Sequence, residues 1–263
     1  LSYLHQMEAL VIGDLILDIY SIGQISRISP EAPVPVVLNA ETSYAAGGAA
    51  NVAANLASMG LNIGIAGILG KDTSAFQLNK ILFDYQIQST IVSSELCPTI
   101  TKMRVIGDGK HIVRLDSEMS FSEESELLFE KSSSLEAPLV ILSDYDKGSL
   151  SDSKKYIAHF QSKGVKVIVD PKKEMSAYFG AWFIKPNKNE FVKYIGNFNS
   201  HEELVTKARE AIHDYSFEHM LVTLGGEGMM YITSDYSEFF PATHQQVADI
   251  TGAGDTVLAG LVF

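Results

Sequence analysis

Ala9-Leu10-Val11-Ile12-Gly13-Asp14 is the stretch whose pattern recurs along the chain and decides the fold. Its four apolar residues predict a buried strand, and Gly13-Asp14 predicts a turn directly after it. Further apolar runs predict strands at 63–68, 139–142, 165–169, 181–184 and 220–223. Helices are predicted at 51–59, 73–85, 152–162, from about 187, and at 201–214. This alternation indicates an α/β fold with a mainly parallel central sheet flanked by helices.

Two segments interrupt the alternation. Residues 16–44 are rich in β-branched side chains and contain Pro30, Pro33 and Pro35, which suit edge strands better than central ones. Residues 88–115 are predicted to form consecutive strands with a turn at 107–109. We therefore expect one domain over residues 1–263, with these two segments forming a small projecting β lid.

Composition limits the classes of function. The chain has 263 residues and a formal net charge of −12, which disfavours nucleic-acid or anionic-membrane surfaces because these partners need a basic field. Cys97 is the only cysteine, so an internal disulfide or a cysteine-based zinc site is excluded. We find no signal peptide and no apolar stretch of about 18 residues, and we expect a cytoplasmic protein.

The run Asp249-Ile250-Thr251-Gly252-Ala253-Gly254-Asp255-Thr256 suits phosphoryl transfer. A β-prone segment precedes it, and a helix-compatible apolar segment follows. Small residues at a helix start allow several backbone N–H groups to point at one anion. An adjacent aspartate can accept a proton. The run therefore predicts an anion cradle beside a general base.

Two stretches near the N-terminus are candidates for ligand binding. The small residues of 45–50 precede Asn51, which offers a donor and an acceptor. Asp14 and Asp18 follow a buried strand, where α/β proteins commonly bind ligands. Each has a structural alternative: the first can be a tight packing loop, and the aspartates can cap backbone N–H groups of a turn.

Two later stretches also have two interpretations. Asn187 and Glu190 lie one turn apart, so they can face a magnesium ion through water or form a capping box at a helix start. Thr223, Gly225 and Gly228 can line a nucleotide or form a plain hairpin turn. The sequence contains no Walker A motif and no dinucleotide fingerprint.

In combination, these pieces resemble the ribokinase (PfkB) family of carbohydrate kinases. The shared patterns are Gly-Gly-Ala-Ala-Asn at 47–51, Pro-Asn-x-x-Glu at 186–190, Thr-x-Gly-x-x-Gly at 223–228, and Asp-x-Thr-Gly-Ala-Gly-Asp at 249–255. The resemblance covers essentially the whole chain. It implies a ribokinase-like fold and an enzyme that uses ATP and Mg²⁺. Lys185, before Pro186, departs from the uncharged residue that is commoner in relatives.

A narrower resemblance points to the substrate. Residues 26–37 are similar to the lid segment of D-glycero-β-D-manno-heptose 7-phosphate kinases, as are residues 47–53, 98–102, 142–148 and 169–172. The resemblance implies transfer of the γ-phosphoryl group of ATP to the anomeric hydroxyl of heptose 7-phosphate, in ADP-heptose and lipopolysaccharide core synthesis. The family's kinase domain normally continues beyond the helix in which this chain stops, so we expect a truncated C-terminus. No nucleotidyltransferase motif is present.

The resemblance also assigns roles to residues. Asp255 is the implied catalytic base, with the N–H groups of Gly252, Ala253 and Gly254 stabilising the transferred group. The sugar would be held by Asp14, Asp18, Gly47, Gly48, Asn51 and Asp144. Magnesium–ATP would be held by Asn187, Glu190, Thr223, Gly225 and Gly228. Asp249 and Thr251 resemble the family's loop for a monovalent cation such as K⁺.

The 7-phosphate of the implied substrate needs positive charge. The candidates are Lys102, Arg104, Lys147, Lys172 and Arg27, for which solvated surface charge is the alternative. Exposed lid edges also predict a homodimer formed through the lid strands. Two other functions stay open: a PfkB kinase of another sugar, and a catalytically silent module that binds sugar or nucleotide.

Overall fold

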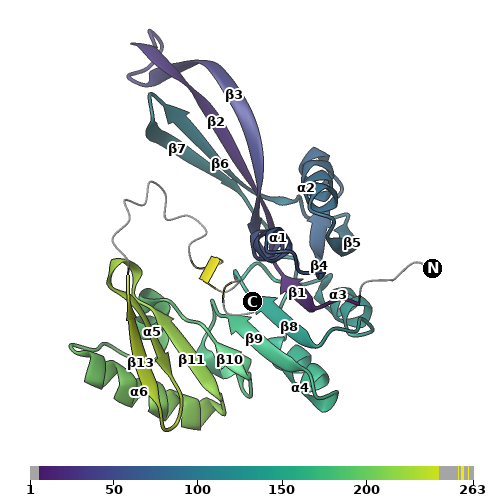
Figure 1. The fold of residues 1–263 in the computed structure, drawn as a ribbon. Coiled ribbons are helices and arrows are strands. Elements are labelled where there is room, and N and C mark those ends of the chain that lie inside the picture. Colours follow the sequence, from purple (N-terminus) through teal and green to yellow (C-terminus); the bar gives the residue numbers. More distant parts are fainter. Residues whose placement is uncertain (1–5, 243–253, 255, 258–259, 261–263) are drawn as a thin grey trace.

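A nine-stranded sheet forms the body of the molecule. The computed structural model describes residues 6–242 together with Gly254, Thr256, Val257 and Gly260 (Figure 1). In spatial order the strands are β13 (Ser237–Pro241), β12 (Gly228–Ile232), β11 (His219–Thr223), β10 (Phe183–Ile184), β9 (Lys166–Asp170), β8 (Leu139–Ser143), β1 (Ala9–Gly13), β4 (Ile63–Gly70) and β5 (Gln88–Ser94). The strands from β11 to β5 pair in parallel, and β12 and β13 extend the sheet in antiparallel pairing. The predicted mainly parallel sheet is confirmed.

Six α-helices connect these strands in the described part of the chain. They are α1 (Ala49–Ser58), α2 (Thr73–Asp84), α3 (Ser125–Ser132), α4 (Ser153–Ser162), α5 (Lys188–Tyr194) and α6 (His201–Tyr215). Side-chain caps fix four of the starts: Asp72 accepts the N–H of Ala75, Asp152 that of Lys155, Asn187 that of Glu190, and Ser200 that of Glu203. Each such cap contributes about 1 kcal/mol to helix stability. None of these helices is long and apolar enough to cross a membrane.

The hydrophobic core lies on both faces of the sheet because alternate residues of each strand point to opposite faces. In β1, Leu10 and Ile12 belong to one buried cluster, and Ala9 and Val11 belong to the other. Helices α4 and α6 supply the first cluster, and α1 and α2 supply the second. The sheet is therefore covered by helices on both faces, as predicted.

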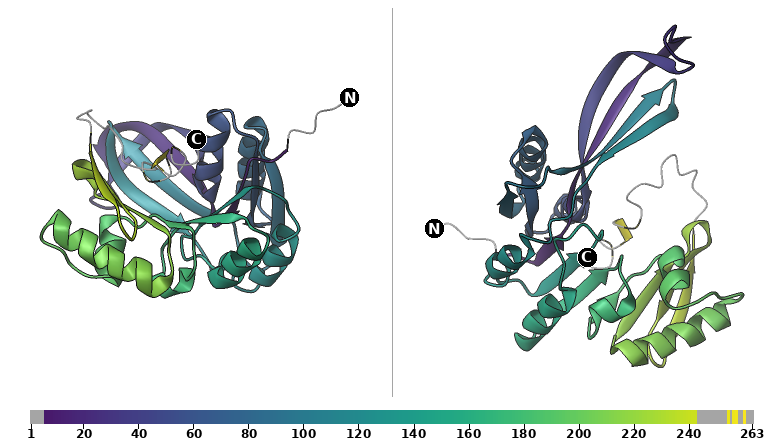
Figure 2. Two further views of the ribbon diagram at one scale, coloured as in Figure 1. Left: turned by 60° about the horizontal axis from the view of Figure 1, so that its bottom comes forward. Right: turned by 180° about the vertical axis from the view of Figure 1, so that it is seen from behind.

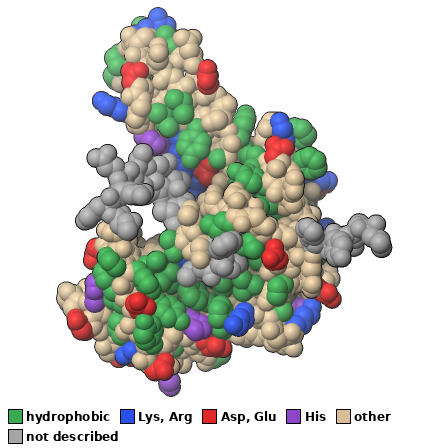
Figure 3. Space-filling view, in the orientation of Figure 1, with side chains coloured by type: hydrophobic (Ala, Val, Ile, Leu, Met, Phe, Trp, Pro, Cys, Tyr) green, Lys and Arg blue, Asp and Glu red, His purple; other side chains and the backbone are tan. Residues whose placement is uncertain are grey.

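The second cluster is less completely covered toward β10 and β12. There Trp182, Met229 and Tyr231 are only partly buried. Figure 3 shows hydrophobic side chains gathered over the lower part of the molecule, where β9 to β13 lie. Val257, from the helical segment near the C-terminus, packs against this cluster.

The lid is a separate four-stranded sheet that projects from the body (Figures 1 and 2). Its order is β3 (Pro35–Gly48), β2 (Leu15–Ile28), β6 (Ile100–Gly107) and β7 (Lys110–Ser117). The prediction that 88–115 lies in the lid is wrong for its first part. Strand β5 pairs along its length with β4 and buries Val92 in the main core, so this part of the lid begins at Ile100.

The lid sheet has a polar face and an apolar face. Asp18 lies opposite Lys102, and Lys102 lies opposite Asp116, so these three share one face. In the next row, Ile19, Tyr44, Met103 and Leu115 pair in the same way on the other face. Tyr44 and Leu115 are 44% and 54% exposed, so much of the apolar face is open to solvent.

Candidate active site

The candidate residues gather at one edge of the main sheet because parallel strands end at the same edge. Asp14 follows β1, Asp144 follows β8, Asp170 ends β9, Lys185 follows β10 and Thr223 ends β11. The lid rises from the same edge, since Asp14 alone separates β1 from β2. Residues that lie far apart in the sequence are thereby brought to one end of the fold.

Asp14 is completely buried and organises a neighbouring loop. One carboxylate oxygen accepts the N–H groups of Tyr145 and Lys147 at 2.8 and 3.1 Å, and the other accepts that of Ser149 at 3.1 Å. The sequence left open that Asp14 caps the backbone N–H groups of a turn. The carboxylate does cap such groups, although the capped loop follows β8 and not β1. Contact with a sugar stays a prediction for Asp14.

Asp144 lies in a second buried network. Its Oδ2 accepts the hydroxyl of Tyr178 at 2.9 Å and pairs with the Lys173 ammonium at 3.0 Å. Burial raises the pKa of the Asp144 carboxyl, and Lys173 opposes that effect. The Tyr178 oxygen also accepts the backbone N–H groups of Lys172 and Lys173 at 2.9 and 3.0 Å. Sequence reasoning missed Tyr178 and Lys173, because only the contact between the loops after β8 and β9 reveals them.

The polar face of the lid contributes a cluster of charges. Asp18 and Arg104 form a buried ion pair. The Lys102 ammonium lies over the Tyr145 ring, 5.4 Å from its centroid. Burial lowers the pKa of Lys102, while Asp18 and Asp116 act in the opposite direction. The Lys102 ammonium thus lies against the loop that Asp14 holds.

Lys147, Gly47 and Gly48 lie where the lid joins the main sheet. The Lys147 ammonium pairs with Glu118 at 2.8 Å. A Cβ at Gly47 would collide with the Asp18 carboxylate, and Gly48 has a φ of 57° with the Asp14 carbonyl beside it. Both positions therefore require glycine for structural reasons. Asn51 lies in the first turn of α1, which follows directly.

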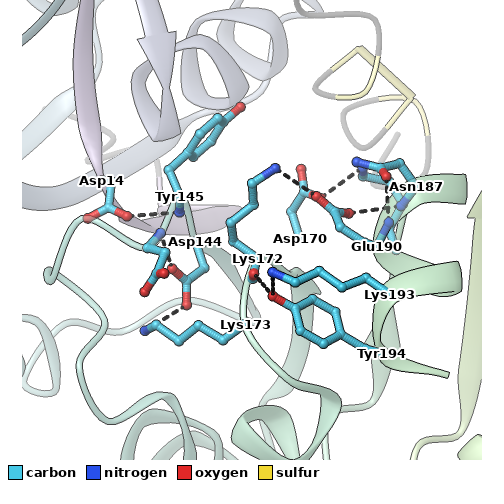
Figure 4. Close-up of polar contacts among 12 residues, drawn as sticks. Asp14, Asp144, Tyr145, Asp170, Lys172, Lys173, Asn187, Glu190, Lys193 and Tyr194 are labelled. Atoms are coloured by element: carbon cyan, nitrogen blue, oxygen red, sulfur yellow. Dashed lines mark hydrogen bonds and ion pairs between the residues drawn. The ribbon is translucent and has the colours of Figure 1, made fainter. Parts of the chain in front are cut away.

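Asn187 and Glu190 form the predicted capping box at the start of α5. Asn187 Oδ1 accepts the N–H of Glu190, and Glu190 Oε2 accepts that of Asn187, both at 2.9 Å. Figure 4 shows Lys172 and Glu190 directed toward each other, with 3.0 Å between Nζ and Oε1. No group of three or more His, Cys, Asp or Glu suited to a metal occurs among the described residues.

The turn after β11 presents an open backbone. Thr223 pairs with Asn187 in a parallel bridge, which places the turn beside α5. A Cβ at Gly225 or Gly226 would meet no atom within 4 Å, so a ligand can approach this backbone closely. Gly228 differs, because its φ is 122° and a Cβ would collide with the carbonyl of Phe240. Gly228 is therefore required by the hairpin itself.

Lys185 is buried at the same edge and pairs with Asp170 at 2.9 Å. A Cβ on Gly254 would lie 3.4 Å from the Lys185 ammonium. The structure thus places one glycine of the predicted anion cradle beside a buried cation. The predictions for Asp249, Thr251, Gly252, Ala253 and Asp255 lie outside the described residues.

Comparison with known proteins gives a consistent assignment. The family model described as pfkB family carbohydrate kinase matches residues 7–263. "Bifunctional protein HldE" of Shewanella sediminis is 42% identical over 259 residues, and that of Shewanella loihica is 41% identical over 259 residues. The alignments cover 97% of this chain and 54% of each relative. The chain therefore spans about half the length of the curated relatives it matches.

Solved structures show the same fold. Phosphofructokinase-2 from Escherichia coli in complex with potassium superposes with a TM-score of 0.80 at 19% identity, covering 98% of this chain and 85% of that chain. A putative phosphofructokinase from Staphylococcus aureus gives a TM-score of 0.76 at 23% identity, covering 97% of this chain and 84% of that chain.

Proposed function

This chain belongs to the pfkB family of carbohydrate kinases, and from that premise we propose that it phosphorylates D-glycero-β-D-manno-heptose 7-phosphate at the anomeric hydroxyl. ATP is the donor, and the product is the 1,7-bisphosphate used in ADP-heptose and lipopolysaccharide core synthesis. One observation carries the choice of a phosphorylated sugar: in an acidic chain, Lys102 and Arg104 lie together on the lid face turned toward the strand ends. The resemblance of residues 26–37 to heptose 7-phosphate kinases supports the particular sugar.

Asp255 is the proposed general base for the anomeric hydroxyl. That hydroxyl is more acidic than an ordinary alcohol, so a carboxylate can accept its proton late in a loose transition state. Backbone N–H groups of Gly252, Ala253 and Gly254 would stabilise charge on the transferred phosphoryl group, an effect of about 3–4 kcal/mol per donor. The proximity of Lys185 to Gly254 supports an anion at this position.

Asn187 and Glu190 are the proposed contacts for hydrated magnesium. Magnesium retains several waters and needs few protein oxygens, and this pair offers one amide and one carboxylate at the edge of the open turn 225–226. The donor set therefore fits an ion held mainly by water and nucleotide phosphates. When bound, magnesium supplies positive charge to the phosphates of ATP. Thr223, Gly225 and Gly228 would line the nucleotide.

A monovalent cation at Asp249 and Thr251 is a further part of the proposal. The E. coli phosphofructokinase-2 structure in complex with potassium shows that this ion occurs with a protein of the same fold.

The sugar is proposed to lie between the lid and the strand ends. Asp14 can take part because an ionised carboxylate has about four acceptor sites, and three are used by the 145–149 loop. Asp18, Gly47, Gly48, Asn51 and Asp144 complete the proposed set around the hydroxyls. Lys102, Arg104 and Lys147 would hold the 7-phosphate.

We also propose a homodimer that forms through the lid, in a cytoplasmic enzyme. The apolar lid face, with Tyr44 and Leu115 about half exposed, supports the dimer because such a face is stabilised by burial. The strands at the lid edges could pair between copies.

Asp255→Asn is the decisive variant for the mechanism. We expect a large loss of turnover with little change in substrate affinity, measured by steady-state kinetics and calorimetry. Asp214→Asn, at an exposed aspartate of α6, is the matched control. Near-wild-type turnover by Asp255→Asn would show that another group is the base.

The substrate is tested by comparing heptose 7-phosphate with fructose 6-phosphate, ribose and adenosine as acceptors. Preference for an unphosphorylated acceptor would contradict the heptose assignment and leave the family assignment intact. Binding of sugar and ATP without product formation would favour a silent binding module.

A further inference from the structure

Lys172 has a backbone held by hydrogen bonds on both sides and a side chain that is half exposed. Its N–H donates to the Tyr178 hydroxyl at 2.9 Å, and its carbonyl accepts the Tyr194 hydroxyl at 2.8 Å. The side chain itself is 48% exposed. The two tyrosines therefore hold the backbone of this lysine, and the half-exposed side chain leaves room for its ammonium group to change partners. Figure 4 shows Tyr194 beside Lys172.

The present partner of that ammonium is Glu190. Lys172 Nζ lies 3.0 Å from Glu190 Oε1, and Oε2 of the same carboxylate accepts the N–H of Asn187. The Glu190 side chain is only 9% exposed, so the ammonium group screens a largely buried carboxylate. Lys172 thus supplies positive charge to the carboxylate that we propose as a contact for hydrated magnesium.

We propose that Lys172 is a nucleotide-phosphate contact that rests on Glu190 until magnesium–ATP binds. This inference rests on the proposed kinase function. Positive charge of a hydrated metal ion held at Glu190 would repel the Lys172 ammonium, and the phosphates of a bound nucleotide would attract it. The lysine stem is flexible and its ammonium has three donors, so the exchange requires no movement of the anchored backbone.

The neighbouring Lys185 does not fit this exchange. Its side chain is 4% exposed and paired with Asp170 at 2.9 Å, so moving it would leave a largely buried carboxylate without its counter-charge. The two lysines therefore have different roles: Lys185 is a fixed charge, and Lys172 is the mobile one. The sequence analysis placed Lys172 among the candidate contacts for the 7-phosphate. Its position beside Glu190 instead places it with the proposed nucleotide contacts.

The first test is calorimetric binding of ATP, ADP and adenosine by the wild type, Lys172→Met and Lys172→Arg. We expect Lys172→Met to weaken ATP and ADP binding at least about tenfold, the usual size of a lost hydrogen bond to a charged group. Adenosine should bind equally to all three proteins, and Lys172→Arg should recover most of the loss. Lys193→Met is the control, because Lys193 is a nearby exposed lysine whose ammonium donates to the Tyr194 hydroxyl and takes no part in the Lys172–Glu190 ion pair.

Three results of this test would overturn the inference. Unchanged ATP binding by Lys172→Met would remove the contact. Equal weakening of adenosine binding would show a structural role. Loss of heptose 7-phosphate binding, measured in the same calorimeter, with ATP binding intact would assign Lys172 to the sugar. Failure of the wild type to bind ATP at all would instead contradict the proposed function.

The second test addresses the resting position on Glu190, using ADP without metal in the presence of EDTA. Glu190→Gln releases Lys172 from its ion pair, so this variant should bind metal-free ADP several-fold more tightly than the wild type. The gain should vanish in Glu190→Gln/Lys172→Met. Equal affinity of the single and double variants for metal-free ADP would show that the ion pair with Glu190 does not keep Lys172 from the phosphates.

Discussion

At the scale of single residues, the lid depends on a buried ion pair between Asp18 and Arg104. Arg104→Met would leave the Asp18 carboxylate buried without its partner, so we expect a loss of about 3–5 kcal/mol in unfolding free energy. Asp18→Asn/Arg104→Met should lose less, because no unpaired charge remains. Urea unfolding followed by circular dichroism measures both values.

Lys71→Met is the control for this prediction. Lys71 pairs with Glu95 on the surface, where such pairs contribute about 0–1 kcal/mol. If Arg104→Met were no more destabilising than Lys71→Met, the Asp18 carboxylate would have to find other compensation in the folded protein.

Lys102 gives the proposed sugar-phosphate site a defined pH dependence. Burial lowers the pKa of its ammonium group, so folding penalises the charged form, and this penalty disappears as the pH rises through the lowered pKa. The phosphate of the ligand favours the charged form. Affinity for heptose 7-phosphate should therefore fall on the alkaline side at a lower pH than for an ordinary lysine.

Calorimetry from about pH 7 to pH 10 tests this dependence. Lys102→Arg should shift the alkaline fall to higher pH, because arginine stays charged throughout this range. An identical pH profile in the two proteins would show that Lys102 does not titrate in contact with the phosphate.

At the scale of elements, local patterns predicted the order and type of the main strands and helices. The runs at 9–12, 63–68 and 139–142 correspond to β1, β4 and β8. Local pattern did not separate β5 from the lid, because a β-prone segment can join either sheet. Pairing with β4 decides between them, and that pairing depends on the tertiary fold.

Local patterns also predicted part of the candidate site, but not the contacts between its loops. The capping box at Asn187 and Glu190 follows from spacing alone. The partners of Asp14 do not, because they lie in a loop that reaches Asp14 only through pairing of β1 with β8. The networks around Tyr178 and Lys172 likewise join loops from separate strands. Such contacts require the sheet order, which single-sequence patterns do not contain.

The two-faced lid leads to a prediction about assembly. Leu115 is 54% exposed on the apolar face, opposite Met103. Leu115→Lys places a charge in the proposed lid interface, so it should convert dimer to monomer without unfolding the lid. Sedimentation velocity measures the state, and Lys110→Gln, at the exposed start of the same strand, is the control. A dimer that survives Leu115→Lys would place the interface elsewhere.

At the scale of the whole molecule, Asp14 lies at the junction of the two sheets. It separates β1 of the main sheet from β2 of the lid, and its carboxylate holds the 145–149 loop. The proposed nucleotide contacts at Asn187, Glu190 and Thr223 all belong to the main sheet and its connections. The proposed sugar contacts include both sheets. Sugar and nucleotide should therefore differ in their effect on the lid.

Hydrogen exchange of backbone amides measures that difference. Heptose 7-phosphate should slow exchange in β2, β6 and the 145–149 loop, because ligand contacts on both sheets oppose their separation. Magnesium–ADP alone should slow exchange at the start of α5 and in the 223–228 turn, with the lid unchanged. At about 100 times its dissociation constant a ligand adds about 2.7 kcal/mol of stability, which is enough to slow exchange measurably. Lys102→Met should abolish lid protection by the sugar phosphate and keep the protection by magnesium–ADP. Equal protection of the lid by magnesium–ADP alone would show that the nucleotide also contacts the lid, and would contradict the division of the two sites between the sheets.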